Sequence, residues 1–139
     1  MSRICGIELK SSEAILAVIE VTDDGYEFVD IEPKRIKLGN DESNELVKSF
    51  YDAVVNFSKD NHIDSFVIKK RAKKGQMAGG AVSFKLEAII QLNGVAGVEF
   101  VSGQGIAAEH KKIPFEFPDG MNKYQENAFM AASLHIRKS

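Results

Sequence analysis

Arg3-Ile4-Cys5-Gly6-Ile7-Glu8 is the stretch that decides the fold, because it is a short apolar strand that ends in a carboxylate. Farther along the chain, the strand-like run from Asp64 to Ile68 ends in Lys69. If these two strands are parallel neighbours, their carboxyl ends meet at one edge of the sheet, where ligands commonly bind in open α/β proteins. We therefore expect Glu8 and Lys69 to be partners at a functional edge.

The segments that follow this first strand predict an antiparallel meander. Residues 14–19 are apolar on both faces and predict a buried second strand. Thr22-Asp23-Asp24-Gly25 is a hairpin signal, and residues 26–31 alternate before the extended piece 35–38. This third strand should lie at the sheet edge, where Pro33 and neighbouring charges are tolerated.

The second half of the chain alternates helices with strands. Helical spacing and end signals predict a helix from a cap at Asn40 or Asp41 to about Asn61, a second over 82–92 and a third over 119–135, while strands are predicted over 63–68 and 95–101. Because the last two strands follow helical crossovers, they should run parallel to the first. The fold class is therefore α/β. A flavodoxin-like or Rossmann fold is disfavoured because both need parallel strands from the start, and because no G-x-G-x-x-G follows the first strand.

Composition limits the function classes. A chain of 139 residues with 44% hydrophobic content predicts a single domain over residues 1–139. Its formal charge of -2 argues against nucleic-acid binding through the whole surface, so any such contact must be local. The single Cys5 predicts a buried hydrophobe, and no signal peptide or membrane-length apolar run is visible, so we expect a soluble, cytoplasmic protein without a membrane partner.

The element order resembles the ribonuclease H-like fold over nearly the whole chain, which implies a mixed five-stranded sheet of order 3-2-1-4-5 flanked by about three helices. Within that superfamily, the chain resembles the RuvC-type Holliday-junction resolvases and their uncharacterised bacterial relatives. The family opens with a strand ending Gly-Ile-Asp, and this chain has Gly6-Ile7-Glu8. The resemblance implies that Glu8 is the one family acid retained in type.

The other acidic positions of the family are replaced. Its fourth strand ends in a glutamate where this chain has Lys69. Its last helix holds two aspartates three residues apart, and Tyr124 and Asn127 occupy those positions here. Glu126 lies one helical step away and would serve only after a shift in register. The resemblance thus implies an altered site.

These replacements matter because phosphodiester hydrolysis in this fold needs two Mg²⁺ or Mn²⁺ ions roughly 4 Å apart, clamped by several carboxylates. One glutamate cannot hold two ions, so Glu8 is the only metal ligand we expect, if there is any. An ammonium of Lys69 within about 4 Å of Glu8 would compete with a metal, with an attraction of up to roughly 4 kcal/mol before desolvation. The alternatives without a functional role are that Glu8 is solvated or paired across the sheet, and that Lys69 belongs to a solvated loop.

A basic run precedes the second predicted helix and predicts an anion site. Its five cations are Lys69, Lys70, Arg71, Lys73 and Lys74. The Gly-rich segment 75–80 then leads into a helix N-terminus, whose free N–H groups favour phosphate. After the last strand, Lys111 and Lys112 follow a Gly-rich turn and would extend a phosphate-binding track. The spacing of the glycines does not fit a nucleotide-binding P-loop.

Three functions follow from these observations. The first is a RuvC-like protein with a degenerate metal site that binds nucleic-acid backbone or another anion without efficient catalysis. The second is a Mg²⁺- or Mn²⁺-dependent nuclease with a rearranged site built from Glu8, Glu126 and Asn127, beside Lys69. The third is a protein-interaction or small-ligand module. Relatives of this type often dimerise, which makes a homodimer a further expectation, whereas zinc, cysteine-nucleophile and serine-hydrolase sites lack the spacing they need.

Overall fold

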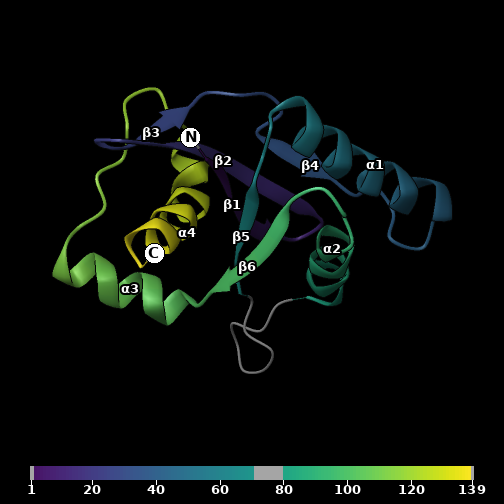
Figure 1. Cartoon of the computed structure of the whole chain (residues 1–139). Coiled ribbons are helices and arrows are strands. Elements are labelled where there is room, and N and C mark those ends of the chain that lie inside the picture. Colours follow the sequence, from purple (N-terminus) through teal and green to yellow (C-terminus); the bar gives the residue numbers. More distant parts are fainter. Residues whose placement is uncertain (1, 71–79, 139) are drawn as a thin grey trace.

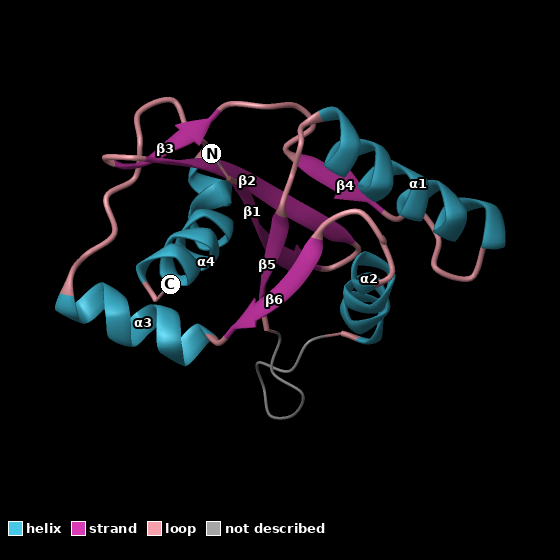
Figure 2. Cartoon of the chain, viewed as in Figure 1, coloured by secondary structure: helices cyan, strands magenta, loops and turns pink. Residues whose placement is uncertain are grey.

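A computed structural model describes residues 2–70 and 80–138 of the chain. One mixed sheet forms the centre, and helices cover both of its faces (Figures 1 and 2). The strands are β1 (Arg3–Lys10), β2 (Glu13–Thr22), β3 (Gly25–Val29), β4 (Arg35–Lys37), β5 (Ser65–Lys69) and β6 (Gly97–Val101). The helices are α1 (Asn44–Asp60), α2 (Ala81–Gln91), α3 (Gly103–Lys112), the 3₁₀ turn η1 (Lys123–Gln125) and α4 (Glu126–Arg137).

The sheet has the order β3-β2-β1-β5-β6. β2 pairs antiparallel with β1 and β3, while β5 is parallel to both β1 and β6. The predicted 3-2-1-4-5 order is therefore confirmed, with β1 at the centre. This order places the carboxyl ends of β1, β5 and β6 at one edge, where the functional residues were expected.

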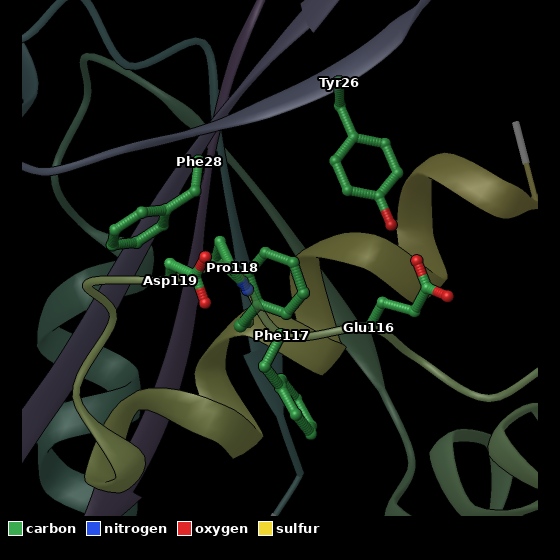
Figure 3. A pocket seen from close by; sticks show the side chains of 7 residues that line it. Tyr26, Phe28, Glu116, Phe117, Pro118 and Asp119 are labelled. Carbon is green, nitrogen blue, oxygen red and sulfur yellow. The ribbon is translucent and has the colours of Figure 1, made fainter.

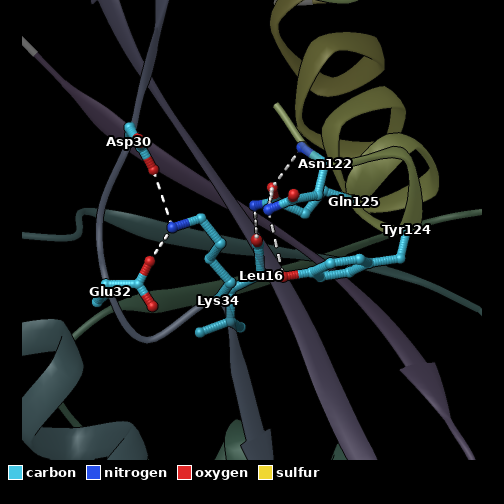
Figure 4. Close-up of polar contacts among 7 residues, drawn as sticks. All are labelled: Leu16, Asp30, Glu32, Lys34, Asn122, Tyr124 and Gln125. Atoms are coloured by element: carbon cyan, nitrogen blue, oxygen red, sulfur yellow. Dashed lines mark hydrogen bonds and ion pairs between the residues drawn. The ribbon is translucent and has the colours of Figure 1, made fainter. Parts of the chain in front are cut away.

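The predicted third strand is in fact two strands, so the described sheet has six strands rather than five. β3 pairs with one end of β2, and the short β4 pairs with the other end, at residues 13–15 of β2. Between them the chain leaves the sheet in a tight loop, where the ammonium of Lys34 pairs with the carboxylates of Asp30 and Glu32 (Figure 4). The Lys34 carbonyl still accepts a 2.9 Å hydrogen bond from the Leu16 N–H.

Two predicted helix starts are wrong. Helix α1 is capped by Ser43, whose hydroxyl accepts a hydrogen bond from the Leu46 N–H, instead of by Asn40 or Asp41. The C-terminal helix begins with η1 at residue 123 instead of at Asp119, because Gly120 adopts a left-handed conformation with φ of 86° and interrupts the chain there. In addition, α3 is a full ten-residue helix, so the described chain has four α-helices instead of three.

The two faces of the sheet form two cores. Cys5, Ile7 and Leu9 of β1 point toward α1 and α2, whereas alternate residues of the same strand point toward α4. Cys5 is completely buried, as its setting in the sequence predicted, and this burial raises the pKa of its thiol far above the ordinary value. No helix in the described parts of the chain combines the length and the apolar character that crossing a membrane requires.

Candidate functional site

One row of side chains crosses the sheet at the carboxyl edge. Glu8 on β1 is the register partner of Lys69 on the parallel strand β5. On its other side Glu8 is opposite Ile15 of β2, and Ile15 is opposite Arg35 of β4. Neighbouring strands lie about 4.8 Å apart, so two cations flank one carboxylate within roughly two strand spacings. We call Arg35, Glu8 and Lys69 the edge row.

The edge row is on the sheet face that α4 covers. The side-chain amide of Asn127, in the first turn of α4, donates a 3.0 Å hydrogen bond to the Glu8 carboxylate. This bond is partly buried, which strengthens a charge-assisted contact. The structure therefore brings together two of the residues that the sequence selected, one from each end of the chain.

A glycine in β1 makes this contact geometrically feasible. Gly6 is two residues before Glu8 and so lies on the same face of the strand. A Cβ atom at Gly6 would lie 1.8 Å from the backbone carbonyl oxygen of Ala128 in α4. Only a residue without a side chain allows α4 to approach β1 this closely, and that approach places Asn127 beside Glu8.

Tyr124 stands, like Asn127, at a position where the resemblance implies an aspartate in the family. The Arg35 guanidinium carbon lies 3.8 Å from the centroid of the Tyr124 ring, a cation–π contact. The Asn122 amide donates a 3.3 Å hydrogen bond to the Tyr124 hydroxyl. Nearby, the buried Gln125 amide donates to the Leu16 carbonyl at 2.8 Å and so fixes the start of α4 on β2 (Figure 4).

Arg35 is the member of the edge row that the sequence did not select as a site residue. In sequence it is one of several charges beside Pro33 and signals only an exposed sheet edge. Its role depends on the register of β4 against β2, which local sequence does not specify. Its cation–π partner Tyr124 is 89 positions farther along the chain.

The expected close ion pair between Glu8 and Lys69 is absent. Among the described residues, the ion pairs within 4.0 Å do not include one between these two side chains. The Lys69 side chain instead runs toward the start of α3, where its Cε lies 3.4 Å from the position that a Cβ atom on Gly103 would take. Asn127 takes the place beside the Glu8 carboxylate, and the ammonium of Lys69 has no described counter-ion.

Two helix N-termini lie at the same edge. Helix α3 follows β6 directly, with Ser102 as its cap. Helix α2 begins beside the turn between β1 and β2, where the Ser83 hydroxyl donates a 3.2 Å hydrogen bond to the Ser11 carbonyl. Free N–H groups at a helix start attract anions. The start of α3 lies beside Lys69, on the face of the edge row, whereas α2 begins on the opposite face of the sheet.

The remaining predicted cations have different positions. Lys70 is exposed and directly follows β5 at the edge. Lys111 and Lys112 are exposed in the last turn of α3, about 12 Å along the helix axis from its start, so the structure does not bring them to Glu8. Arg71, Lys73 and Lys74 lie outside the described residues.

The donor set at the edge does not fit a pair of divalent metal ions. In residues 2–70 and 80–138, no group of three His, Cys, Asp or Glu side chains could hold a metal ion, and this includes Glu8 and Glu126. The neighbours of Glu8 are the Asn127 amide, which donates to it, and Lys69 at the paired position of β5, while Arg35 lies two strands away over the Tyr124 ring. Lys69 on the neighbouring strand and Arg35 two strands away would both repel a divalent ion at this single carboxylate.

Comparison with known proteins gives a family and a fold. A family model described as "Protein of unknown function (DUF3010)" matches residues 2–135. No curated protein matches the chain. Among solved structures, the chain is similar to RuvC from Thermus thermophilus, with a TM-score of 0.69 and 12% identity over 96% of this chain and 92% of that one.

Two further structures agree with this result. The Holliday junction resolvase of fowlpox virus has a TM-score of 0.56 and 10% identity, with 99% of each chain covered. The yeast mitochondrial Holliday junction resolvase has a TM-score of 0.56 and 12% identity, over 98% of this chain and 79% of that one. These identities are too low to carry function but show a RuvC-like ribonuclease H fold, as the resemblance predicted.

Proposed function

Because the chain belongs to the DUF3010 family, whose description assigns no function, we propose one from its site: it binds a phosphate backbone at the edge row and does not cleave it efficiently. The observation that carries this proposal is the charge of the row. Arg35 and Lys69 contribute two positive charges, and Glu8 contributes one negative charge. A site with a net positive charge attracts the anion itself instead of a metal that would bridge to it.

The geometry around Lys69 supports phosphate as the bound group. Its ammonium has no described counter-ion, and its stem lies beside the first turn of α3. Exposed Lys70 directly follows Lys69 at the same edge. A phosphate there would meet ammonium groups and helix N–H donors together, which is the usual composition of a backbone-binding site.

Glu8 has a positioning role in this proposal. Its carboxylate accepts the Asn127 amide and so ties α4 to the carboxyl end of β1. It also offsets one of the two cations, which lowers the cost of placing them on a partly buried face. The net charge of -2 for the whole chain fits phosphate binding at one local site instead of over the whole surface.

The fold supports nucleic acid as the source of the phosphates. RuvC from Thermus thermophilus, which shares this fold, has been solved in complex with a Holliday junction substrate. A protein that keeps the architecture and exchanges acids for cations would retain backbone binding and lose metal-dependent cleavage. A four-way junction is therefore the first ligand to test, beside duplex DNA and an RNA–DNA hybrid.

The decisive experiment measures binding of these three ligands by fluorescence anisotropy over a series of salt concentrations. We expect affinity to fall as salt rises, because bound phosphates release counterions. The variant Lys69→Gln should lower the affinity several-fold and reduce the salt slope by about one. Lys48→Gln is the matched control, because it removes an exposed charge from α1, on the other side of the sheet.

The same samples separate binding from catalysis. Incubation with Mn²⁺ or Mg²⁺ should leave junction, duplex and hybrid intact. Cleavage that depends on Mn²⁺ and is lost in Glu8→Gln would favour the alternative of a rearranged nuclease built from Glu8, Glu126 and Asn127. No binding at low salt, or binding that salt does not weaken, would overturn the backbone-binding proposal and leave an interaction or small-ligand module.

A further inference from the structure

A pocket of about 330 Å³ lies at the opposite end of the sheet from the edge row. Its walls come from β3 and from the segment between α3 and η1, and its base comes from α4 (Figure 3). Phe28 of β3 is opposite Ile19, which is opposite Ile4 near the start of β1, whereas Glu8 is near its end. The pocket is thus separate from the proposed phosphate site.

Four aromatic rings form the apolar part of this pocket. Phe129 is 2% exposed and forms the base. The rings of Tyr26, Phe28 and Phe117 surround it, with centroids 6.3, 6.5 and 5.9 Å from that of Phe129. Phe117 is 37% exposed, so one aromatic wall is open to a ligand. Aromatic faces carry negative potential and attract cations.

The polar part of the pocket is acidic. Glu116 and Asp119 both line it and are exposed, and none of its seven lining residues is cationic. Residues 23–32 nearby contain five carboxylates; Asp30 and Glu32 pair with Lys34, whereas Asp23, Asp24 and Glu27 form no ion pair within the described residues. The ligand that complements aromatic faces beside carboxylates is a cation with a flat, partly apolar surface.

We propose that this pocket binds an arginine side chain from an extended segment of a partner protein. A guanidinium stacks on aromatic rings and bonds carboxylates in a planar fork, which an ammonium cannot do. The chain uses this chemistry itself, since Arg35 lies 3.8 Å over Tyr124 and Arg137 lies 4.2 Å over Phe115.

The edge position of β3 supports a peptide as the source of that arginine. In the described sheet β3 is a terminal strand that pairs only with β2. An extended segment that adds to its outer edge would point alternate side chains to the face that carries Tyr26 and Phe28. One arginine in such a segment reaches the pocket, and acidic residues around β3 attract its basic neighbours.

The test is an NMR titration of the whole protein with a capped five-residue peptide that has arginine at the centre of a Thr-Val sequence. We expect shift changes in the ring signals of Phe28, Phe117 and Phe129. The peptide with norleucine at the centre should produce none, and the lysine peptide should bind more weakly. Equal binding of the norleucine peptide would show an apolar pocket only, and equal binding of the lysine peptide would overturn the guanidinium assignment.

Variants of the two pocket carboxylates test whether they contribute to binding of the arginine peptide. The double variant Glu116→Gln and Asp119→Asn keeps the shape of both side chains and should weaken arginine-peptide binding by about threefold or more. Glu27→Gln is the matched control, because it removes a carboxylate from β3 on the sheet face opposite to the pocket. If Glu27→Gln weakened arginine-peptide binding equally, the effect would come from the overall negative charge of this region and not from carboxylates in the pocket. An absence of ring shifts with the arginine peptide would overturn the proposal outright.

Discussion

Replacing Gly6 by alanine tests the packing on which the whole site depends. A Cβ atom there would lie 1.8 Å from the Ala128 carbonyl oxygen, 2.8 Å from the Ala128 carbonyl carbon and 3.0 Å from the Ala132 Cβ. The nearest neighbour is backbone, so no side chain can rotate away to relieve the clash. The variant must therefore displace α4, β1 or both.

The size of the effect follows from these distances. To restore even a short contact, α4 must retreat by roughly 1.2 Å, which would lengthen the 3.0 Å bond between Asn127 and Glu8 to about 4 Å and break it. Overpacking of a core costs about 1–3 kcal/mol, and a lost hydrogen bond to a charged group adds to that. We expect Gly6→Ala to lower the free energy of unfolding by about 3 kcal/mol or more.

Urea unfolding followed by circular dichroism at 222 nm measures this difference, since the chain has no tryptophan for fluorescence. Gly97→Ala is the matched control. It is also a strand glycine, but its nearest neighbour would be the Ser65 hydroxyl at 3.7 Å, an ordinary contact. Alanine there should leave stability unchanged or raise it by up to about 1 kcal/mol, because it restricts the unfolded chain.

A Gly6→Ala midpoint equal to that of the wild type, at an unchanged denaturant slope, would refute the close approach of α4. A second readout separates packing from general damage. The side-chain amide signal of Asn127 should shift in Gly6→Ala and remain in place in Gly97→Ala. Loss of stability without that shift would mean that the Glu8 contact does not depend on Gly6.

Three other perturbations test the cores. Asn93 is buried, and its side-chain amide makes four hydrogen bonds across the α2–β6 loop, so Asn93→Ala should destabilise by about 2–4 kcal/mol in urea, against less than about 1 kcal/mol for Asn40→Ala. The buried Ser133 hydroxyl has no hydrogen-bond partner in the described chain, so Ser133→Ala should leave the stability measured in urea unchanged or raise it by up to about 1 kcal/mol. The Cys5 thiol should react with a disulfide reagent only as fast as the protein opens. Burial raises its pKa in the folded state, so stability should fall as pH rises above the ordinary value of 9.0, and Cys5→Ala should lose that dependence.

The sequence was sufficient for features that follow from local pattern and chain direction. Apolar runs located the main strands, and the helical crossovers before β5 and β6 required those strands to be parallel to β1. Parallel neighbours end at the same edge, so the register of Glu8 with Lys69 followed from two strand ends alone. The start of the last helix did not follow, because Asp119 and Asn122 are equally good caps and the conformation of Gly120 decides between them.

Features that depend on contacts between segments far apart in the chain could not be predicted from the sequence. The place of Arg35 requires the short β4 to pair with one end of β2 and Tyr124 to be held over it. The aromatic pocket joins Phe28 to Phe117, which are 89 positions apart. Neither pairing leaves a local trace, since an edge charge and an exposed aromatic are ordinary in any surface segment.

The contacts at this edge also explain how the fold keeps its shape when cations stand beside a single carboxylate. Four carboxylates on neighbouring elements repel one another unless cations neutralise them, so a metal-dependent site of that kind is costly when empty. In this chain the same elements are held by a glycine-to-backbone contact, by a buried amide on the Leu16 carbonyl and by the bond from Asn127 to Glu8. None of these contacts needs an ion. The architecture can therefore persist at 12% identity to RuvC, and the two cations Lys69 and Arg35 in the edge row are the condition on which the proposed phosphate binding rests.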